Sequence, residues 1–207
     1  MDAKIRPLII SHLKKDKKLA VLIENCEVTI HKEPINVFDD LIRSIVSQQL
    51  STAAAATIYG RFIQSLDTSV SVHEQIKNKS ADELRSYGLS FQKAGYIQNV
   101  ARHFEEQQLF DMNWDTWSDE DIILELTKIK GVGRWTVEMI MMFSLQREDV
   151  LPLDDLIIRN NMIALYKPTS EKKQLIEDLK SIAEPWRPYR SYACRYLWAA
   201  KDSKFFK

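Results

Sequence analysis

Apolar residues recur at helical spacing along almost the whole chain. The clearest case is the segment from Phe38 to Val46, where apolar side chains stand at positions 38, 41, 42, 45 and 46. This spacing lines one face of an α-helix and leaves the other face polar. No two segments show the paired alternation that a β-hairpin requires, and only Val28–Ile30 has the pattern of a short extended piece. The pattern therefore predicts an all-α protein.

Capping residues mark where several of these helices begin. Serine or threonine before an apolar run caps a helix, and Glu three residues later completes a capping box. Ser51 or Thr52, Ser80, Ser90 and Ser118 stand at such positions, and the helix that begins after Ser80 is stopped by Gly88. Apolar spacing and caps together predict helices near 5–13, 19–23, 38–46, 53–62, 80–88, 90–107, 118–126, 134–145, 171–183 and 190–201.

Composition narrows the class of protein. The chain has 207 residues, 45% of them hydrophobic and 28% charged, as in ordinary globular proteins. It has no apolar window long enough for a membrane span and no secretory signal pattern, so we expect a cytoplasmic protein, associated with the nucleoid in a prokaryote or located in the nucleus of a eukaryote. Cys26 and Cys194 lie far apart, and the four histidines have no metal-ligand spacing.

The net charge is zero, but charge is unevenly distributed along the chain. Residues 1–35, 36–155 and 156–207 carry net charges of +2, −8 and +6. We therefore expect any polyanion to be bound by the ends of the chain and by local backbone donors, because no bulk positive field exists.

The segment from Leu126 to Val137 has the most distinctive local pattern. One helix ends, Gly131 and Gly133 flank a small apolar residue, and a new helix begins at once. Taken alone, so short a glycine motif favours a structural bend. The backbone amides that begin the second helix can nevertheless bind a phosphate without any lysine.

Four segments of the sequence together favour phosphate binding over a purely structural bend. In chain order they are Ser47–Ser51 (SQQLS), Gly131–Thr136 (GVGRWT), Leu151–Asp155 (LPLDD), and Trp186–Ala193 (WRPYRSYA) followed by Leu197-Trp198. Over about residues 38–198 the chain resembles the helix-hairpin-helix (HhH-GPD) DNA glycosylase superfamily. Within it, the chain is most similar to the monofunctional 3-methyladenine DNA glycosylase II (AlkA-like) branch.

The resemblance implies two helical lobes with a DNA-binding and active-site cleft between them. One lobe would span 36–135 and end in the helix-hairpin-helix motif, and the other would join 1–35 to 136–207. The implied activity is removal of alkylated bases, such as 3-methyladenine and 7-methylguanine, from double-stranded DNA by base flipping, in base excision repair. The implied partner is double-stranded DNA with alkylated bases. The protein would act as a monomer, and it would need no cofactor for catalysis.

Asp155 is the catalytic residue that the resemblance implies. Cleavage of an N-glycosidic bond builds positive charge on the sugar, and a fixed carboxylate stabilises that charge. The same carboxylate can orient or deprotonate the attacking water. Spacing alone fits a helix N-cap at Asp155 equally well, whereas Asp154 is expected to be an N-cap.

The resemblance also implies a base pocket and a wedge. Trp135 stands where strand-cutting members of the superfamily carry a lysine nucleophile, so no AP lyase activity is expected. Its indole can instead stack on a cationic purine. Trp198, Gln48 and Met139 would line the same pocket, with Met139 in place of a tyrosine. Core packing is the alternative for Trp198. Gln49 would fill the gap that the flipped base leaves.

Contacts to the DNA backbone are implied at Gly131, Gly133, Arg134, Thr136, Arg190 and Ser191. Together with Arg187 and Arg195, Arg190 is expected to form a basic face, although a solvated charged surface is the alternative. The backbone carbonyls of Thr127, Ile129 and Gly131 would hold a monovalent cation, Na⁺ or K⁺, at the hairpin, since carbonyl oxygens suit hard cations.

Two other functions remain open at this stage. A non-catalytic helix-hairpin-helix module would bind DNA without releasing a base and would have no use for Asp155. The second is a glycosylase for an oxidised or mispaired base. Its strand-cutting forms would be expected to carry lysine in place of Trp135. Many such relatives also have a four-cysteine cluster near the C-terminus, where this chain has only Cys194.

Overall fold

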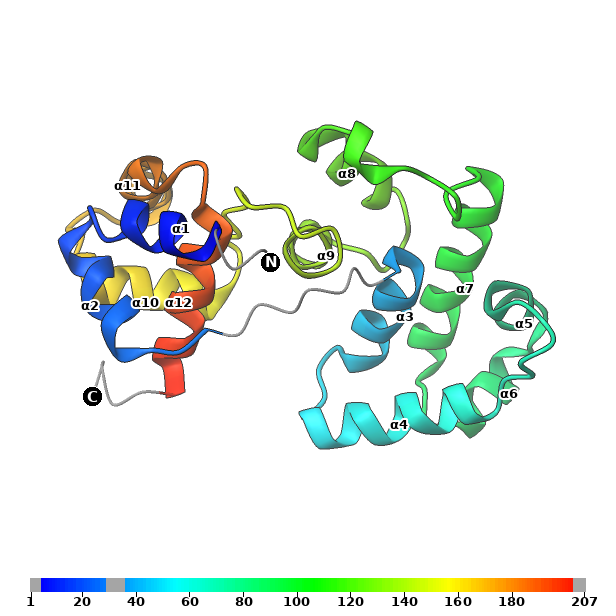
Figure 1. Ribbon diagram of the computed structural model, residues 1–207. Coiled ribbons are helices and arrows are strands. Elements are labelled where there is room, and N and C mark those ends of the chain that lie inside the picture. The colour runs from blue at the N-terminus through cyan, green and yellow to red at the C-terminus, as the bar shows by residue number, and fades with distance from the viewer. Residues whose placement is uncertain (1–4, 29–35, 203–207) are drawn as a thin grey trace. The chain divides into compact units, whose positions relative to one another are not determined.

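A computed structural model describes residues 5–28 and 36–202 (Figure 1). These residues form twelve α-helices and two short 3₁₀ turns and contain no strand, which confirms the all-α prediction. Thr29 and Ile30 of the expected extended piece lie outside the described residues. None of the described helices has the length and apolarity that crossing a bilayer requires.

The chain divides into two compact units. One is Ile35–Ile140, and the other joins Met1–Pro34 to Met141–Lys207. The division falls inside helix α9 (Arg134–Phe143), a little more than one turn beyond the boundary expected after residue 135.

The unit Ile35–Ile140 is built around α7. Its elements are α3 (Val37–Ser47), α4 (Thr52–Gln64), α5 (Val72–Asn78), α6 (Ala81–Ser86), α7 (Phe91–Glu106), a 3₁₀ turn (Trp114–Thr116), α8 (Asp119–Leu126) and the first turns of α9. Helix α7 packs against α3, α5 and α6, as Figure 1 shows. The apolar face predicted between Phe38 and Val46 is buried, so α3 contributes a full stripe to this core.

The predicted serine caps are confirmed. The side chains of Ser51, Ser90 and Ser118 each accept a hydrogen bond from a backbone amide in the first turn of the helix that follows. Ser80 and Glu83 form the full capping box. These caps satisfy amides that a helix leaves without intrahelical partners, and they fix where each helix begins.

The second unit contains α1 (Ile5–Leu13), α2 (Lys17–Asn25), α10 (Leu156–Tyr166), α11 (Lys172–Ala183), a 3₁₀ turn (Glu184–Trp186) and α12 (Arg190–Asp202). Helix α12 packs against α10 and α2 (Figure 1). Asp16 caps α2 and accepts hydrogen bonds from the Tyr166 hydroxyl at 2.6 Å and the Trp186 indole N–H at 3.0 Å. Burial acts to raise the pKa of Asp16, but these hydrogen bonds outweigh burial and lower it.

Candidate active site

The hairpin between α8 and α9 depends on one glycine. Gly131 has φ of +106°, a conformation that side-chain-bearing residues rarely adopt, and a Cβ there would overlap the Tyr96 ring. Gly133 stands directly before α9, and a Cβ there would meet no atom within 4 Å. Gly131 is therefore needed for the shape of the turn, whereas Gly133 leaves open space in front of the first amides of α9.

One face of α7 holds both the hairpin and the turn that follows α3. The Lys93 ammonium group donates to the carbonyls of Val46 and Gln48 at 2.8 and 2.6 Å, and burial lowers the pKa of this lysine. Asn99 donates to the carbonyl of Lys130 at 3.2 Å. Because residues three and four apart share a helix face, Lys93, Tyr96 and Asn99 act from the same side of α7.

The turn after α3 is also joined directly to the hairpin. The side-chain amide of Gln48 donates to the Gly131 carbonyl at 3.3 Å. Gln49 is exposed and has φ of +56°, in the left-handed region that favours glycine. This backbone conformation costs free energy, and such strain is typical of functional positions.

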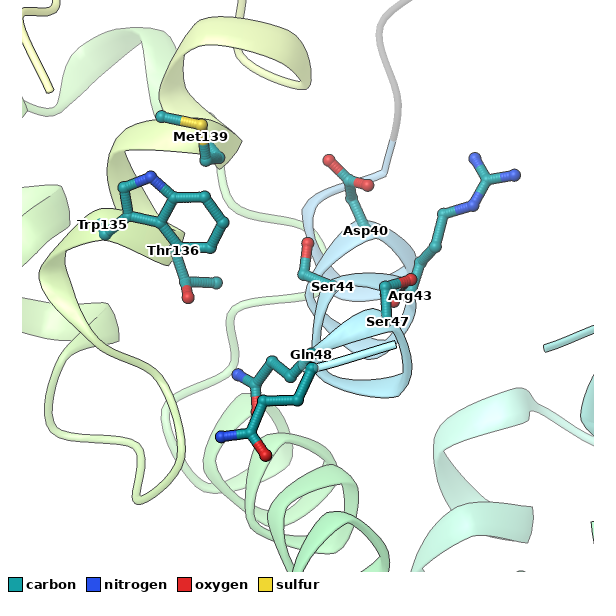
Figure 2. A pocket seen from close by; sticks show the side chains of 9 residues that line it. Asp40, Arg43, Ser44, Ser47, Gln48, Trp135, Thr136 and Met139 are labelled. Carbon is teal, nitrogen blue, oxygen red and sulfur yellow. Dashed lines mark hydrogen bonds between the residues drawn. The ribbon is translucent and has the colours of Figure 1, made fainter. Parts of the chain in front are cut away.

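A pocket of about 510 Å³ lies between α3 and α9, within the unit Ile35–Ile140 (Figure 2). Its lining residues are Asp40, Arg43, Ser44, Ser47, Gln48 and Gln49 from α3 and the following turn, and Trp135, Thr136 and Met139 from α9. Trp135 is 42% exposed, so this large aromatic side chain is not part of the buried core. The pocket brings together the predicted residues Gln48, Gln49, Trp135 and Met139.

Asp155 lies in the other unit and is only 6% exposed. It is the N-cap of α10, where its Oδ1 accepts from the amides of Ile157 and Ile158, both at 2.9 Å. The indole N–H of Trp198 donates to the same oxygen at 3.0 Å. The expectation that Asp154 is the N-cap is wrong, because Asp154 is exposed and the residue after it caps the helix.

Trp198 is held in place by a stack of side chains. Its ring lies 5.4 Å from the Phe143 ring at an interplanar angle of 7°. The Arg195 guanidinium lies 4.6 Å from the centre of the same phenylalanine ring and donates to the Met142 carbonyl at 2.6 Å. Burial lowers the pKa of Arg195. These contacts fix the indole that hydrogen-bonds Asp155.

The start of α12 is tied to the loop that leads to Asp155. The Arg190 Nε donates to Asp149 at 2.7 Å, and the buried Ser191 hydroxyl donates to the Arg147 carbonyl at 2.6 Å and accepts from the Val150 amide at 2.9 Å. The contact of Arg190 and Ser191 with the DNA backbone stays a prediction.

The three arginines of the expected basic face each contact another side chain of the same unit. Arg187 pairs with Asp149 and Glu184, Arg190 pairs with Asp149, and Arg195 stacks on Phe143. Asp149 and Glu184 therefore balance the charges of Arg187 and Arg190 within this unit.

The remaining hairpin residues differ in how they are placed. Arg134 pairs with the buried Glu138 at 3.1 Å and lies 3.8 Å from Glu120. Thr136 is 5% exposed and lines the pocket.

Sequence reasoning missed Asp40 and Ser44, and the available signal was their four-residue spacing on α3, the helix that leads to Gln48.

Among residues 5–28 and 36–202, no three His, Cys, Asp or Glu side chains are grouped to hold a metal ion. The hairpin offers backbone carbonyls instead. The Ile129 carbonyl accepts from the Val132 amide at 3.0 Å, and the Gly131 carbonyl accepts from Gln48. A carbonyl oxygen has two lone pairs, so both can also coordinate a cation.

The fold and these turns define a helix-hairpin-helix DNA-repair protein. Residues 42–186 match the model of the HhH-GPD superfamily of base excision DNA repair proteins, and the chain belongs to that family. It is 36% identical to DNA-3-methyladenine glycosylase 1 of Schizosaccharomyces pombe, over 91% of this chain and 82% of that protein. It is 28% identical to a putative DNA-3-methyladenine glycosylase of Bacillus subtilis, over 92% of this chain and 67% of that protein.

Solved structures of 3-methyladenine DNA glycosylases are also similar to this chain. The DNA-3-methyladenine glycosidase of Bacillus halodurans superposes with a TM-score of 0.78 at 36% identity, covering 93% of this chain and 88% of that one. A 3-methyladenine DNA glycosylase of S. pombe in complex with abasic DNA superposes with a TM-score of 0.75 at 33% identity, covering 94% and 97%.

Proposed function

We propose that the protein is a monofunctional DNA glycosylase that releases alkylated, positively charged purines from double-stranded DNA. The observation that carries the proposal is the pocket beside the hairpin, where the exposed Trp135 lies with Gln48, Gln49 and Met139. Its volume of about 510 Å³ falls in the ~300–1,000 Å³ range of small-molecule sites, so a purine base fits by volume.

The hairpin and the following turn supply DNA binding in this proposal. The first amides of α9 bind a phosphate, and the open space at Gly133 lets the DNA backbone approach. Gln49 enters the duplex and occupies the position of the flipped base, for which its exposed, strained turn is suited.

The chemistry is hydrolysis of the bond between C1′ and the base nitrogen. The base departs with the electron pair of that bond, which neutralises its positive charge, while a water oxygen bonds to C1′ and releases a proton. Trp135 stacks on the cationic base before it leaves. The carboxylate of Asp155 stabilises the positive charge that develops on the sugar, in a position already fixed by Trp198 and the amides of α10.

The absence of a lysine at position 135 gives a test of this reaction class. We expect the protein to leave the DNA strand intact after base release, because no amine at that position can form a Schiff base. Duplex DNA with one 7-methylguanine is incubated with the protein, and strand breaks are measured before and after alkali. Breaks that appear only after alkali support a monofunctional glycosylase. Breaks without alkali, together with covalent trapping by borohydride, would contradict it.

We also propose that the carbonyls of Thr127, Ile129 and Gly131 hold Na⁺ or K⁺ when DNA is bound. The ion would bridge the hairpin to a phosphate, and the support is the hard oxygen donor set of the turn. Replacing sodium by tetramethylammonium at constant ionic strength is expected to weaken DNA binding. Equal affinity in the two salts would contradict a cation at the hairpin.

A further inference from the structure

The pocket has two walls of opposite chemistry. Asp40 and Ser44 stand four residues apart on α3, so they share one face of that helix, and Gln48 follows directly after its last residue. Trp135 and Met139 stand four residues apart on α9 and form the opposite, apolar wall. Figure 2 shows these two sets of side chains on either side of the pocket.

Asp40 brings the negative charge to this pocket. The charged residues of its lining are Asp40 and Arg43. The guanidinium of Arg43 lies over the Tyr59 ring, 5.4 Å from its centre, and Figure 2 shows it extending away from α9. Asp40 is therefore the acidic side chain that the described lining of the pocket presents beside Trp135 and Met139.

We infer that Asp40 is a specificity-determining residue that selects positively charged bases, an inference that rests on the proposed function. A carboxylate accepts hydrogen bonds and donates none, so it matches a base that offers N–H groups and carries positive charge. The face of Trp135 favours the same ligand, since an aromatic face attracts a cation. Asp40 acts on the base, whereas Asp155 acts on the sugar.

The neighbouring Asp39 provides a matched control. Both acids lie in the first turn of α3 and interact favourably with its N-terminus, but Asp39 is exposed and does not line the pocket. Asp39→Asn therefore removes the same charge from the same turn. Asp40→Glu keeps the charge at the pocket.

The test measures kcat/KM for duplexes with one 7-methylguanine, a cationic base, or one hypoxanthine, a neutral base. Asp40→Asn is expected to lower kcat/KM for 7-methylguanine about tenfold and to lower kcat/KM for hypoxanthine by a smaller factor. Asp39→Asn is expected to stay within about threefold of wild type on 7-methylguanine, and Asp40→Glu is expected to lose less than Asp40→Asn because it keeps the charge. Circular dichroism confirms that each variant is folded.

Two results would overturn the role of Asp40. One is an equal effect of Asp40→Asn and Asp39→Asn on 7-methylguanine release, and the other is an equal loss on the cationic and the neutral base. Either result leaves the proposed glycosylase activity intact, because that activity is measured on the wild type in the same assay. A wild type that releases no base from either duplex would instead remove the proposed function.

Discussion

Asp155→Asn is expected to slow base release by about a hundredfold or more while the protein keeps its fold. Asparagine caps a helix about as well as aspartate, and its amide oxygen can still accept from Trp198 and from the two amides of α10. The substitution therefore removes the negative charge and keeps the local structure. In the proposed reaction this charge stabilises the cationic sugar, so we expect the rate to fall and the stability to change little.

Single-turnover rates of 7-methylguanine release measure this effect, and thermal unfolding measures the stability. The neighbouring Asp154 is exposed and provides the control, since Asp154→Asn removes a charge one residue away without touching the cap. We expect Asp154→Asn to react like the wild type. An Asp155→Asn enzyme with an unchanged rate, or an equal loss in both variants, would contradict the catalytic assignment.

Gly131→Ala is expected to destabilise the protein by about 2–5 kcal/mol. An alanine must adopt the strained φ of +106°, and its Cβ must displace the Tyr96 ring from its place on α7. The hairpin carbonyl that accepts from Gln48 lies at the same residue, so the turn after α3 shifts with it. Chemical denaturation measures the loss. A variant as stable as the wild type would show that the tight turn is not required.

Gly133→Ala gives the contrasting result. A Cβ at this position meets no protein atom within 4 Å, so the free energy of unfolding should change by less than about 0.5 kcal/mol. We expect DNA affinity to fall about tenfold, because the added methyl group stands where a phosphate approaches the amides of α9. Fluorescence anisotropy with abasic duplex measures this affinity. Wild-type affinity would contradict backbone binding at the hairpin.

The helices of this protein could be predicted because local patterns specify them. The apolar stripe of α3 and the serine caps act within a few residues of sequence, and the structure follows them. Helix α5 was missed because only Ile76 among its seven residues is fully buried, so it carries no periodic signal. A helix this short is stabilised by packing against α7 and not by its own pattern.

The site was predicted in part, for a physical reason. Gln48, Gln49 and Trp135 belong to sequence motifs, Met139 stands one helical turn after Trp135, and the structure places all four in one pocket. Lys93 was missed because an isolated lysine in sequence is indistinguishable from a surface charge, and only tertiary structure brings it to the Gln48 carbonyl.

The same limit applies to charges whose partners are distant in sequence. Arg190 and Ser191 bind the loop that contains Asp149, about forty residues earlier in the chain, and no local pattern reveals that pairing. Asp40 resembles an ordinary residue on the polar face of α3, and only the position of α9 shows that this face lines a pocket.

The most direct test is to identify the base that the wild-type protein releases from methylated duplex DNA. We predict free 3-methyladenine and 7-methylguanine, detected by chromatography and mass spectrometry above the spontaneous rate, with the DNA strands intact. DNA that is bound without any released base would contradict the account and favour a binding module. Release of only oxidised or mispaired bases would contradict it in favour of another glycosylase.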